Sequence, residues 1–171
     1  KKYQKVLEFG SGVGTLTMIL QKFAEQVWAC EWDELALKGL AKTIAQAEVS
    51  ENNPEVDLKS KIQLHLGDFH RPQKLLENQN FDLIVVNPAR SGLKNFLQPV
   101  FASPSFQKKP SDLLYMSCFL PSFIEDLKNI MQDLSEQQNA VEYRLSEVHI
   151  VDQFPMSPHY EILAWLQVCS R

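Results

Sequence analysis

Short apolar segments rich in β-branched residues alternate along this chain with longer segments of helical periodicity, and this alternation restricts the fold more than any other feature. The short segments, each expected to be a strand, are residues 6–9, 27–30, 62–66, 81–86 and 112–116. Repeated strand-helix units place parallel strands side by side, joined by crossover helices. The sequence therefore predicts an α/β fold with a doubly wound, mostly parallel sheet.

Helices are expected in the connecting segments. Apolar residues recur at helical spacing from about residue 13 to 25, and again after Asp33, whose carboxylate is suited to cap the second helix. The polar stretch 48–61 interrupts this pattern and is expected to be a loop. Ser122 is expected to cap the helix after the fifth strand, which should end near Glu136.

The C-terminal part departs from strand-helix alternation. Residues 143–151 and 160–168 are both extended in pattern, and a Pro-containing turn rather than a helix links them. They are expected to pair as an antiparallel hairpin. Residues 103–111 are expected to be a surface loop, and no second domain boundary is visible, so residues 1–171 are expected to form one domain.

Composition excludes several classes of protein. The chain is 44% hydrophobic and 22% charged, as in ordinary globular proteins, and no apolar run approaches the roughly 18 to 20 residues that cross a bilayer. Three scattered cysteines predict neither a disulfide framework nor a zinc site, which favours a cytoplasmic location. The four histidines lack metal-ligand spacing, so no metal is expected. A formal net charge of −4 is unfavourable for nucleic-acid binding by this chain alone.

A glycine-rich turn follows the first expected strand. The sequence E-F-G-S-G-V-G covers Glu8 to Gly14, and its glycines Gly10, Gly12 and Gly14 let the backbone approach a ligand closely. Glu8, the acidic residue that opens this sequence, is expected to belong to the same ligand site. The dinucleotide fingerprint G-x-G-x-x-G requires a third glycine where this chain has Thr15. The pattern therefore predicts a ligand site but does not support the binding of a pyrophosphate.

Two acidic residues lie at the ends of the next strands. Glu31 ends the second strand, where a carboxylate accepts hydrogen bonds from ribose hydroxyls, although it can equally serve as a charge at the start of a helix. Asp68 follows the third strand. Because open α/β sheets bind ligands at the carboxyl ends of their strands, both acids are candidates for the same ligand site as the glycine loop.

Three further segments complete the pattern: N-P-A-R-S-G at 87–92, Y-M-S-C-F-L at 115–120 and F-P-M-S-P-H-Y-E at 154–161. Together they resemble the RNA 5-methyluridine methyltransferases, which carry D-P-P-R-x-G, Y-x-S-C-N-P and F-P-x-T-x-H-x-E in this order. The glycine loop resembles motif I of the class I methyltransferases. The resemblance implies a Rossmann-like, seven-stranded sheet and S-adenosylmethionine as cofactor. It also implies that Asp68 reads the adenine amino group and that Asn87 faces the cofactor or a base.

The chemistry of uridine methylation explains two of these residues. Carbon 5 of a pyrimidine is a poor nucleophile until a thiolate adds to carbon 6, and a base must later remove the proton from carbon 5. Cys118 is the candidate nucleophile and Glu161 the candidate base. An antiparallel last strand would deliver Glu161 to the sheet edge where Cys118 lies. Cys30 and Cys169 are expected to be inert, and His159 is expected to be structural.

The chain also departs from the family pattern, which makes it a divergent member. Asn87 replaces an aspartate, and Phe119-Leu120 replaces Asn-Pro. Two alternatives therefore stay open, namely a non-catalytic paralogue that acts as a binding module and an amino-group methyltransferase that uses Asn87. The expected partner is transfer or ribosomal RNA. Binding of that RNA is expected to require upstream domains of a longer polypeptide, of which residues 1–171 would form the C-terminal catalytic part.

Overall fold

The computed structural model describes residues 1–51, 57–67, 79–93, 110–133, 143–152 and 156–169. Its elements in chain order are β1 (Tyr3–Phe9), α1 (Thr17–Leu20), β2 (Ala24–Glu31), α2 (Glu34–Glu51), α3 (Leu58–Lys61), β3 (Ile62–Leu66), β4 (Leu83–Val86), β5 (Asp112–Ser117), α6 (Leu120–Asp133), β6 (Tyr143–Val151) and β7 (Glu161–Val168).

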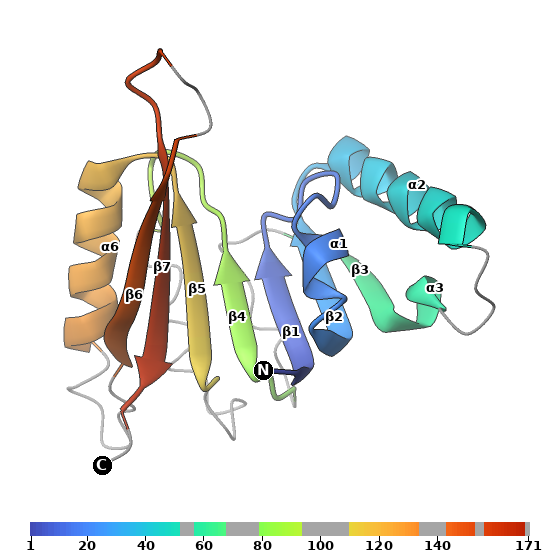
Figure 1. Ribbon diagram of the computed structural model, residues 1–171, viewed down its shortest axis with the longest axis horizontal. Helices are drawn as coiled ribbons and strands as arrows, with labels where there is room; N and C mark the ends of the chain where they lie inside the picture. The colour runs from blue at the N-terminus through green and yellow to red at the C-terminus, as the bar shows by residue number, and fades with distance from the viewer. Residues whose placement is uncertain (52–56, 68–78, 94–109, 134–142, 153–155, 170–171) are drawn as a thin grey trace. The chain divides into compact units, whose positions relative to one another are not determined.

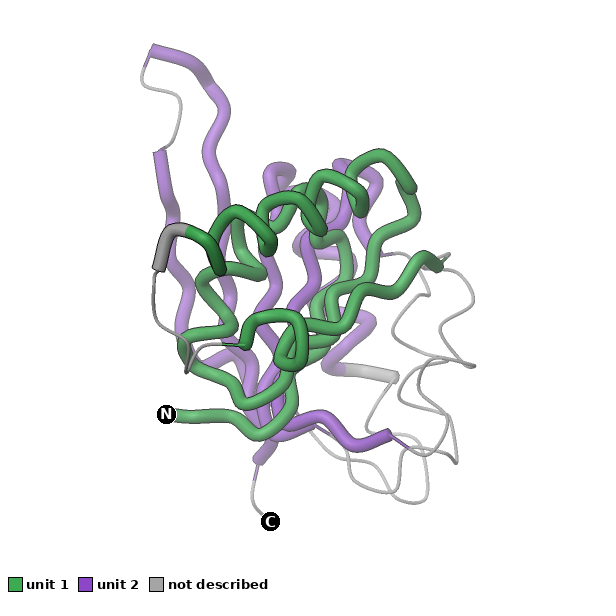
Figure 2. Tube along the Cα trace, turned by 90° about the vertical axis from the view of Figure 1, so that its right-hand side faces the viewer, with its two compact units in different colours: residues 1–71 green, residues 72–171 purple. Residues whose placement is uncertain are grey.

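The strands form a seven-stranded mixed sheet in the order β3-β2-β1-β4-β5-β7-β6 (Figure 1). The predicted α/β fold with antiparallel C-terminal strands is confirmed. The chain divides into two compact units, residues 1–71 and 72–171 (Figure 2), which are described in turn. Within the described part of the chain, none of the helices combines the length and the apolar character that crossing a membrane requires.

The first unit contains the parallel strands β1, β2 and β3. Phe9 pairs with Cys30, and Glu31 pairs with Leu66, so the three strands end at the same edge. Val6 and Val27 are completely buried, because a strand covered on both faces excludes water from its apolar side chains. The carboxyl ends of these strands thus carry the glycine loop, Glu31 and Gly67 at one edge of the unit.

The prediction of a helix at residues 13–25 is wrong in its length. Only Thr17–Leu20 is helical, and β2 already begins at Ala24. The amide of Tyr3 donates to the carbonyl of Phe23 at 2.8 Å, which extends the strand pairing back to this point. Leu20 is buried, but Ile19 is 51% exposed, so the apolar residues of this segment do not form one buried helical face.

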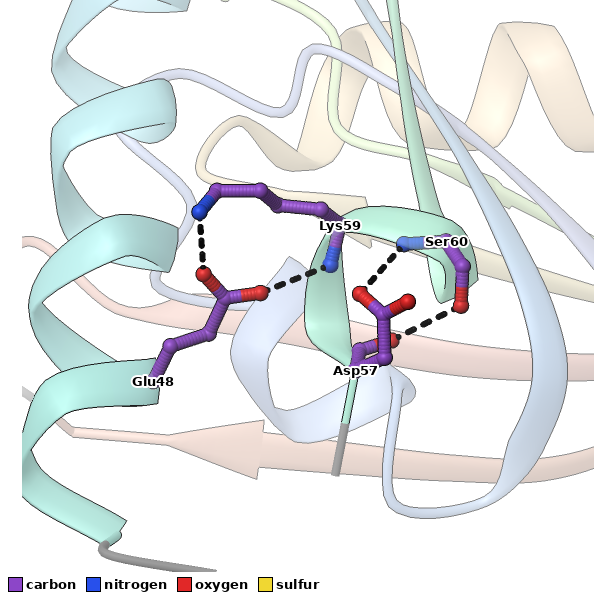
Figure 3. A network of polar contacts seen from close by, with 4 residues as sticks. All are labelled: Glu48, Asp57, Lys59 and Ser60. Carbon is purple, nitrogen blue, oxygen red and sulfur yellow. Dashed lines mark hydrogen bonds and ion pairs between the residues drawn. The ribbon is translucent and has the colours of Figure 1, made fainter. Parts of the chain in front are cut away.

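The second helix confirms its predicted cap, since the Asp33 carboxylate accepts the amide of Leu35 at 2.8 Å. The polar stretch 48–61 is not entirely a loop, because α2 continues to Glu51 and α3 forms a further turn. Figure 3 shows the contacts that order this region. Glu48 accepts the Lys59 amide at 3.0 Å and pairs with its ammonium at 2.6 Å, while Asp57 caps α3 by accepting the Ser60 amide at 3.0 Å.

The second unit combines parallel and antiparallel strands. β4 pairs in parallel with β5, and β7 lies antiparallel between β5 and β6, as the hairpin prediction requires. The edge strand β6 carries a bulge between Leu145 and Glu147. All four residues of β4 are buried, and β4 begins two residues later than the strand expected at residues 81–86.

Helix α6 begins earlier than its sequence predicts. It starts at Leu120, so Ser122 lies inside the first turn and its hydroxyl donates to the Phe119 carbonyl at 3.1 Å instead of capping the helix. The Ser117 hydroxyl accepts the Phe119 amide at 3.2 Å just before the helix. Proline at the second helical position is compatible with this early start, because a first-turn amide has no partner within the helix. The expected end near Glu136 and most of the loop 103–111 lie outside the described residues.

Candidate functional site

The glycine loop in the first unit is anchored to the neighbouring strand. The amides of Gly10 and Ser11 both donate to the Cys30 carbonyl, at 3.0 and 3.2 Å, and the Gly14 amide donates to the Ser11 carbonyl at 2.9 Å. Gly10, Gly12 and Gly14 have φ angles of 81°, 55° and 96°, in the left-handed region. The loop is therefore a tight turn whose shape depends on its glycines.

Gly12 and Gly14 face different surroundings. A Cβ added at Gly14 would lie 2.2 Å from Cδ1 of Leu40 on α2, so this glycine lets the helix pack against the loop. A Cβ added at Gly12 would meet nothing within 4 Å. Gly12 therefore presents its backbone to open space, which is the geometry that close approach of a ligand requires.

Glu31 secures this loop through its carboxylate. Oε2 accepts the Gly12 amide at 2.8 Å, and Oε1 accepts the amides of Trp32 and Asp33 at 2.8 and 3.0 Å. The side chain is 6% exposed. Since a carboxylate offers about four lone-pair sites, these three bonds leave room for one further donor on Oε2. Support of the loop and the start of α2 is thus the role that the geometry shows, and acceptance from a ribose hydroxyl stays a prediction.

Glu8 lies at the end of β1 and is 1% exposed. Its Oε2 accepts the hydroxyl of Thr17 at 2.6 Å. Burial raises the pKa of this carboxyl to about 7, with a smaller contribution from the negative charge of Glu31. The side chain therefore connects the end of β1 to α1, and direct contact with a ligand stays a prediction.

One polar residue of the loop was not singled out from the sequence. Ser11 is 5% exposed, and its hydroxyl has no hydrogen-bond partner among the described residues. A buried polar atom without a partner is uncommon and often marks a place where a ligand or water completes the structure. The position of Ser11 within the glycine motif is the sequence feature that could have indicated it. Asp68 lies outside the described residues, one position after Gly67, whose amide donates to the Glu31 carbonyl at 3.0 Å.

The second unit brings together the other candidate residues at one edge. Asn87 directly follows β4 and is exposed, Cys118 directly follows β5 and is half-buried, and Glu161 is the half-buried first residue of β7. Figure 1 shows β7 running antiparallel to β5, so the start of β7 lies beside the end of β5.

The strand register relates the segments that carry Cys118 and Glu161. The last paired residues of β5 and β7 are Ser117 and Ile162. Directly opposed residues of antiparallel strands have Cα atoms roughly 4.5 to 5.5 Å apart. Cys118 follows Ser117, and Glu161 precedes Ile162, so the structure brings the segments of a thiol and a carboxylate from distant parts of the sequence to the same sheet edge.

The other two cysteines have different environments. Cys30 is buried in β2, and burial, together with the charges of Glu8 and Glu31, raises the pKa of its thiol far above the ordinary value. Cys169 follows the end of β7, opposite the edge that carries Glu161. All three cysteines are free thiols. In the described residues, no group of three or more His, Cys, Asp or Glu side chains is arranged to hold a metal ion.

The turn after β4 is held in place by a residue that sequence analysis missed. The Gly92 amide donates to the Ala89 carbonyl at 2.9 Å, and Gly92 has a φ of 74°. The next amide, that of Leu93, donates to the buried carboxylate of Asp126 on α6 at 2.7 Å. Asp126 occupies a helical position with acidic and basic neighbours in sequence, so no local pattern distinguishes it.

The third motif forms the turn before β7. The Ser157 hydroxyl accepts the His159 amide at 3.1 Å, and Met156 has a φ of 73° and is fully exposed. Phe154 and Pro155 lie outside the described residues. The contact of the His159 backbone with Ser157 stabilises the turn that leads into Glu161.

No protein-family model matches the chain, but individual proteins are similar to it over most of its length. An uncharacterized RNA methyltransferase of Bdellovibrio bacteriovorus is 39% identical over 167 residues, which cover 97% of this chain and 39% of that protein. The tRNA (uracil(54)-C(5))-methyltransferase of Pyrococcus abyssi is 26% identical over 163 residues, 95% of this chain and 33% of that protein. A 23S rRNA (uracil(747)-C(5))-methyltransferase of Pyrococcus horikoshii is 29% identical over 157 residues, 92% of this chain and 31% of that protein.

A solved structure shows the same fold. The crystal structure of the Pyrococcus abyssi tRNA (uracil-54, C5)-methyltransferase in complex with S-adenosyl-L-homocysteine matches with a TM-score of 0.69 and 25% identity, over 95% of this chain and 34% of that one. The chain thus spans between 31% and 39% of the length of the relatives described above.

Proposed function

The chain is a divergent homologue of the RNA uracil-5 methyltransferases, and from this premise we propose that it transfers a methyl group from S-adenosylmethionine to carbon 5 of a uridine in RNA. The observation that carries the proposal is the β5-β7 register, whose last pair, Ser117 and Ile162, lies next in sequence to Cys118 and Glu161. The substrate RNA is transfer or ribosomal RNA, as the names of the relatives indicate.

The glycine loop fits the proposed cofactor. The open face of Gly12, the unpartnered hydroxyl of Ser11 and the remaining acceptor site on Glu31 offer close approach and polar contacts in one place. Glu8, Gly10 and Gly14 shape this loop, and Asp68 and Asn87 complete the proposed contacts. When bound, S-adenosylmethionine supplies an electrophilic methyl group.

The residues of the second unit supply the remaining chemistry. The Cys118 thiolate forms a bond to carbon 6 of the uracil, and the displaced electron pair makes carbon 5 nucleophilic. After carbon 5 has accepted the methyl group, Glu161 removes the proton from that carbon. The returning electron pair then breaks the bond between carbon 6 and sulfur and releases the thiolate. Both residues must face one substrate, which neighbouring positions at one sheet edge allow.

The experiment that tests this proposal uses the full-length polypeptide and depends on the order in which the two residues act. Cys118→Ala should prevent any covalent adduct with RNA, whereas Glu161→Gln should allow attack but slow proton removal, so the methylated nucleotide should stay attached to the protein. Denaturing electrophoresis and mass spectrometry detect the adduct. RNA containing 5-fluorouridine is the positive control for wild type, because fluorine cannot leave as a proton does.

Cys169→Ala is the matched control, since this free thiol lies away from the proposed site and its loss should leave adduct formation unchanged. Methylation that persists in Cys118→Ala would exclude the proposed nucleophile and favour an amino-group methyltransferase using Asn87. If wild type binds the cofactor but never forms an adduct, the chain is a non-catalytic paralogue.

The proposal extends to the setting of the protein. Residues 1–171 would form the catalytic domain of a longer polypeptide, in keeping with the fraction of its relatives that the chain spans. A reducing compartment such as the cytoplasm would keep the Cys118 thiol available as a nucleophile.

A further inference from the structure

Asp126 joins three segments of the second unit through one carboxylate oxygen. Its Oδ2 accepts the phenol hydroxyl of Tyr115 at 2.5 Å and the backbone amide of Leu93 at 2.7 Å. Tyr115 belongs to β5, Leu93 to the segment after β4, and Asp126 itself to α6. The Asp126 side chain is only 4% exposed, so both bonds are shielded from water.

Gly92 shows how closely the turn after β4 approaches α6. A Cβ added at this glycine would lie 2.5 Å from Oδ2 of Asp126 and 2.9 Å from Cβ of Ser122, and its φ of 74° also disfavours other residues. The turn therefore packs directly on the helix. The glycine of the segment 87–92 is required by this contact.

Burying a carboxylate is costly unless hydrogen bonds compensate for lost hydration. An apolar residue would fill the same space without that cost, but it would not fix the direction of its neighbours. Two short hydrogen bonds to a charged acceptor are directional and strong. Burial and the adjacent Asp126 raise the pKa of Tyr115, so the phenol stays protonated and remains a donor.

We infer that Asp126 is a positioning residue that holds the turn carrying Asn87 and Arg90 in register with the segment carrying Cys118. The inference rests on the proposed function. Tyr115 lies three residues before Cys118, α6 begins two residues after it, and Leu93 ends the turn that starts at Asn87. Oδ2 of Asp126 thus contacts both the strand that leads to Cys118 and the turn that begins at Asn87.

The test compares Asp126→Ala, Asp126→Asn and Tyr115→Phe with wild type. Because small displacements of reacting groups cost about a hundredfold in rate, Asp126→Ala should slow adduct formation at Cys118 by about that factor. Asp126→Asn keeps one carbonyl acceptor and should recover part of the loss, and Tyr115→Phe should have the smallest effect. The affinity for S-adenosylmethionine should fall much less than the rate of adduct formation in all three variants, since Asn87 is the one proposed cofactor contact on this turn and the contacts with the glycine loop belong to the first unit.

Asp112→Asn provides the matched control for a purely structural effect. Asp112 is also fully buried and accepts Trp165 Nε1 and Gln167 Nε2, both at 3.0 Å, but it lies at the opposite end of β5 from Cys118. Below its unfolding temperature this variant should form adduct at the wild-type rate. Equal slowing by Asp112→Asn and Asp126→Asn would overturn the inference.

Amide hydrogen exchange at Leu93 gives a readout that is independent of activity. Exchange should be slow in wild type and at least tenfold faster in Asp126→Asn, while Asp112→Asn leaves it slow.

If wild type forms no adduct, the proposed function fails, yet the exchange result still reports on the Asp126 contact. If Leu93 exchanges equally in wild type and Asp126→Asn, or if Asp126→Ala is folded and reacts at the wild-type rate, Asp126 does not position the turn. If Asp126→Ala does not fold, the rates of adduct formation in Asp126→Asn and Tyr115→Phe test the inference instead. Wild-type rates in both variants would overturn it.

Discussion

Single atoms decide what each glycine of the loop after β1 contributes. Gly14 leaves room for Leu40, whose Cδ1 would otherwise lie 2.2 Å from a new Cβ, whereas Gly12 faces open space. Gly14→Ala should therefore destabilise the protein by roughly 2 to 4 kcal/mol, through the clash and the positive φ together. Gly12→Ala carries only the conformational cost, about 1 kcal/mol.

Ligand binding should show the opposite order of importance. Gly12→Ala places a methyl group on the open face of the loop and should weaken S-adenosylmethionine binding at least tenfold while the protein stays folded. Urea denaturation and titration calorimetry measure the two effects. Gly67→Ala is the control for stability, because a Cβ there meets nothing within 4 Å. Unchanged cofactor affinity in Gly12→Ala would argue against this face as the binding site.

The buried carboxyl of Glu8 makes stability depend on pH. Its pKa is raised from 4.5 to about 7 in the folded protein. The unfolded chain therefore loses this proton at lower pH than the folded chain, so the contribution to stability is fully present below pH 4.5 and is lost as the pH rises through 7. By this linkage, the effect amounts to on the order of 3 kcal/mol.

Glu8→Gln should remove this dependence, because the amide oxygen still accepts the Thr17 hydroxyl but carries no charge. The variant should be more stable than wild type at pH 8 and similar to it at pH 4.5, as measured by urea unfolding at both values. Glu34→Gln, an exposed change on α2 whose side chain is 64% exposed, serves as the control and should leave the pH profile unchanged. A parallel pH profile for wild type and Glu8→Gln would contradict the prediction.

At the level of elements, the strands were predictable and the helix boundaries were not. Every expected strand is present, because apolar, β-branched runs mark the buried strands β1 and β4 directly, and an extended pattern marks even β6, which is exposed beyond Tyr143. The helix expected at residues 13–25 shortened to Thr17–Leu20, since pairing with β1 draws Phe23 and Ala24 into the extended chain. Such competition between local propensity and tertiary pairing is invisible in one sequence.

The same distinction applies to the candidate site. The end of each strand is readable from the sequence, so the positions of Glu31, Cys118 and Glu161 at strand ends follow from the pattern. The pairing of Leu93 with Asp126 joins residues 33 positions apart, and nothing near either residue indicates it. The Asp126 side chain lies on the buried side of α6, although an acidic residue on a helix ordinarily indicates a side that faces solvent.

At the level of the whole molecule, the proposed roles divide between the two compact units. The glycine loop and Glu31 lie in residues 1–71, and Cys118, Glu161 and Asp126 lie in residues 72–171. Each unit contains contacts that hold its own candidate residues, through Glu31 in the first and Asp126 in the second. Substitutions in the glycine loop are therefore expected to affect cofactor binding, and substitutions at Cys118 or Glu161 to affect adduct formation.

The charge of the chain leads to a prediction about RNA binding. Phosphate contacts supply most nucleic-acid affinity, and each neutralised phosphate steepens the dependence on salt. This chain has a formal net charge of −4, with 17 basic and 21 acidic residues. The isolated 171-residue chain should therefore bind transfer or ribosomal RNA weakly, with Kd on the order of micromolar or higher at physiological salt.

Fluorescence anisotropy with labelled RNA between about 50 and 200 mM salt measures both the affinity and its salt slope. The slope should be shallow, because few basic groups are available to release counterions. A polypeptide in which a basic RNA-binding domain precedes this chain should bind more tightly and with a steeper slope. Calorimetric binding of S-adenosylmethionine to the same preparation shows that the isolated chain is folded. Nanomolar affinity of the isolated chain at 150 mM salt would instead mean that the 17 basic residues are gathered on one RNA-binding face, and Lys→Gln changes on that face should then flatten the slope.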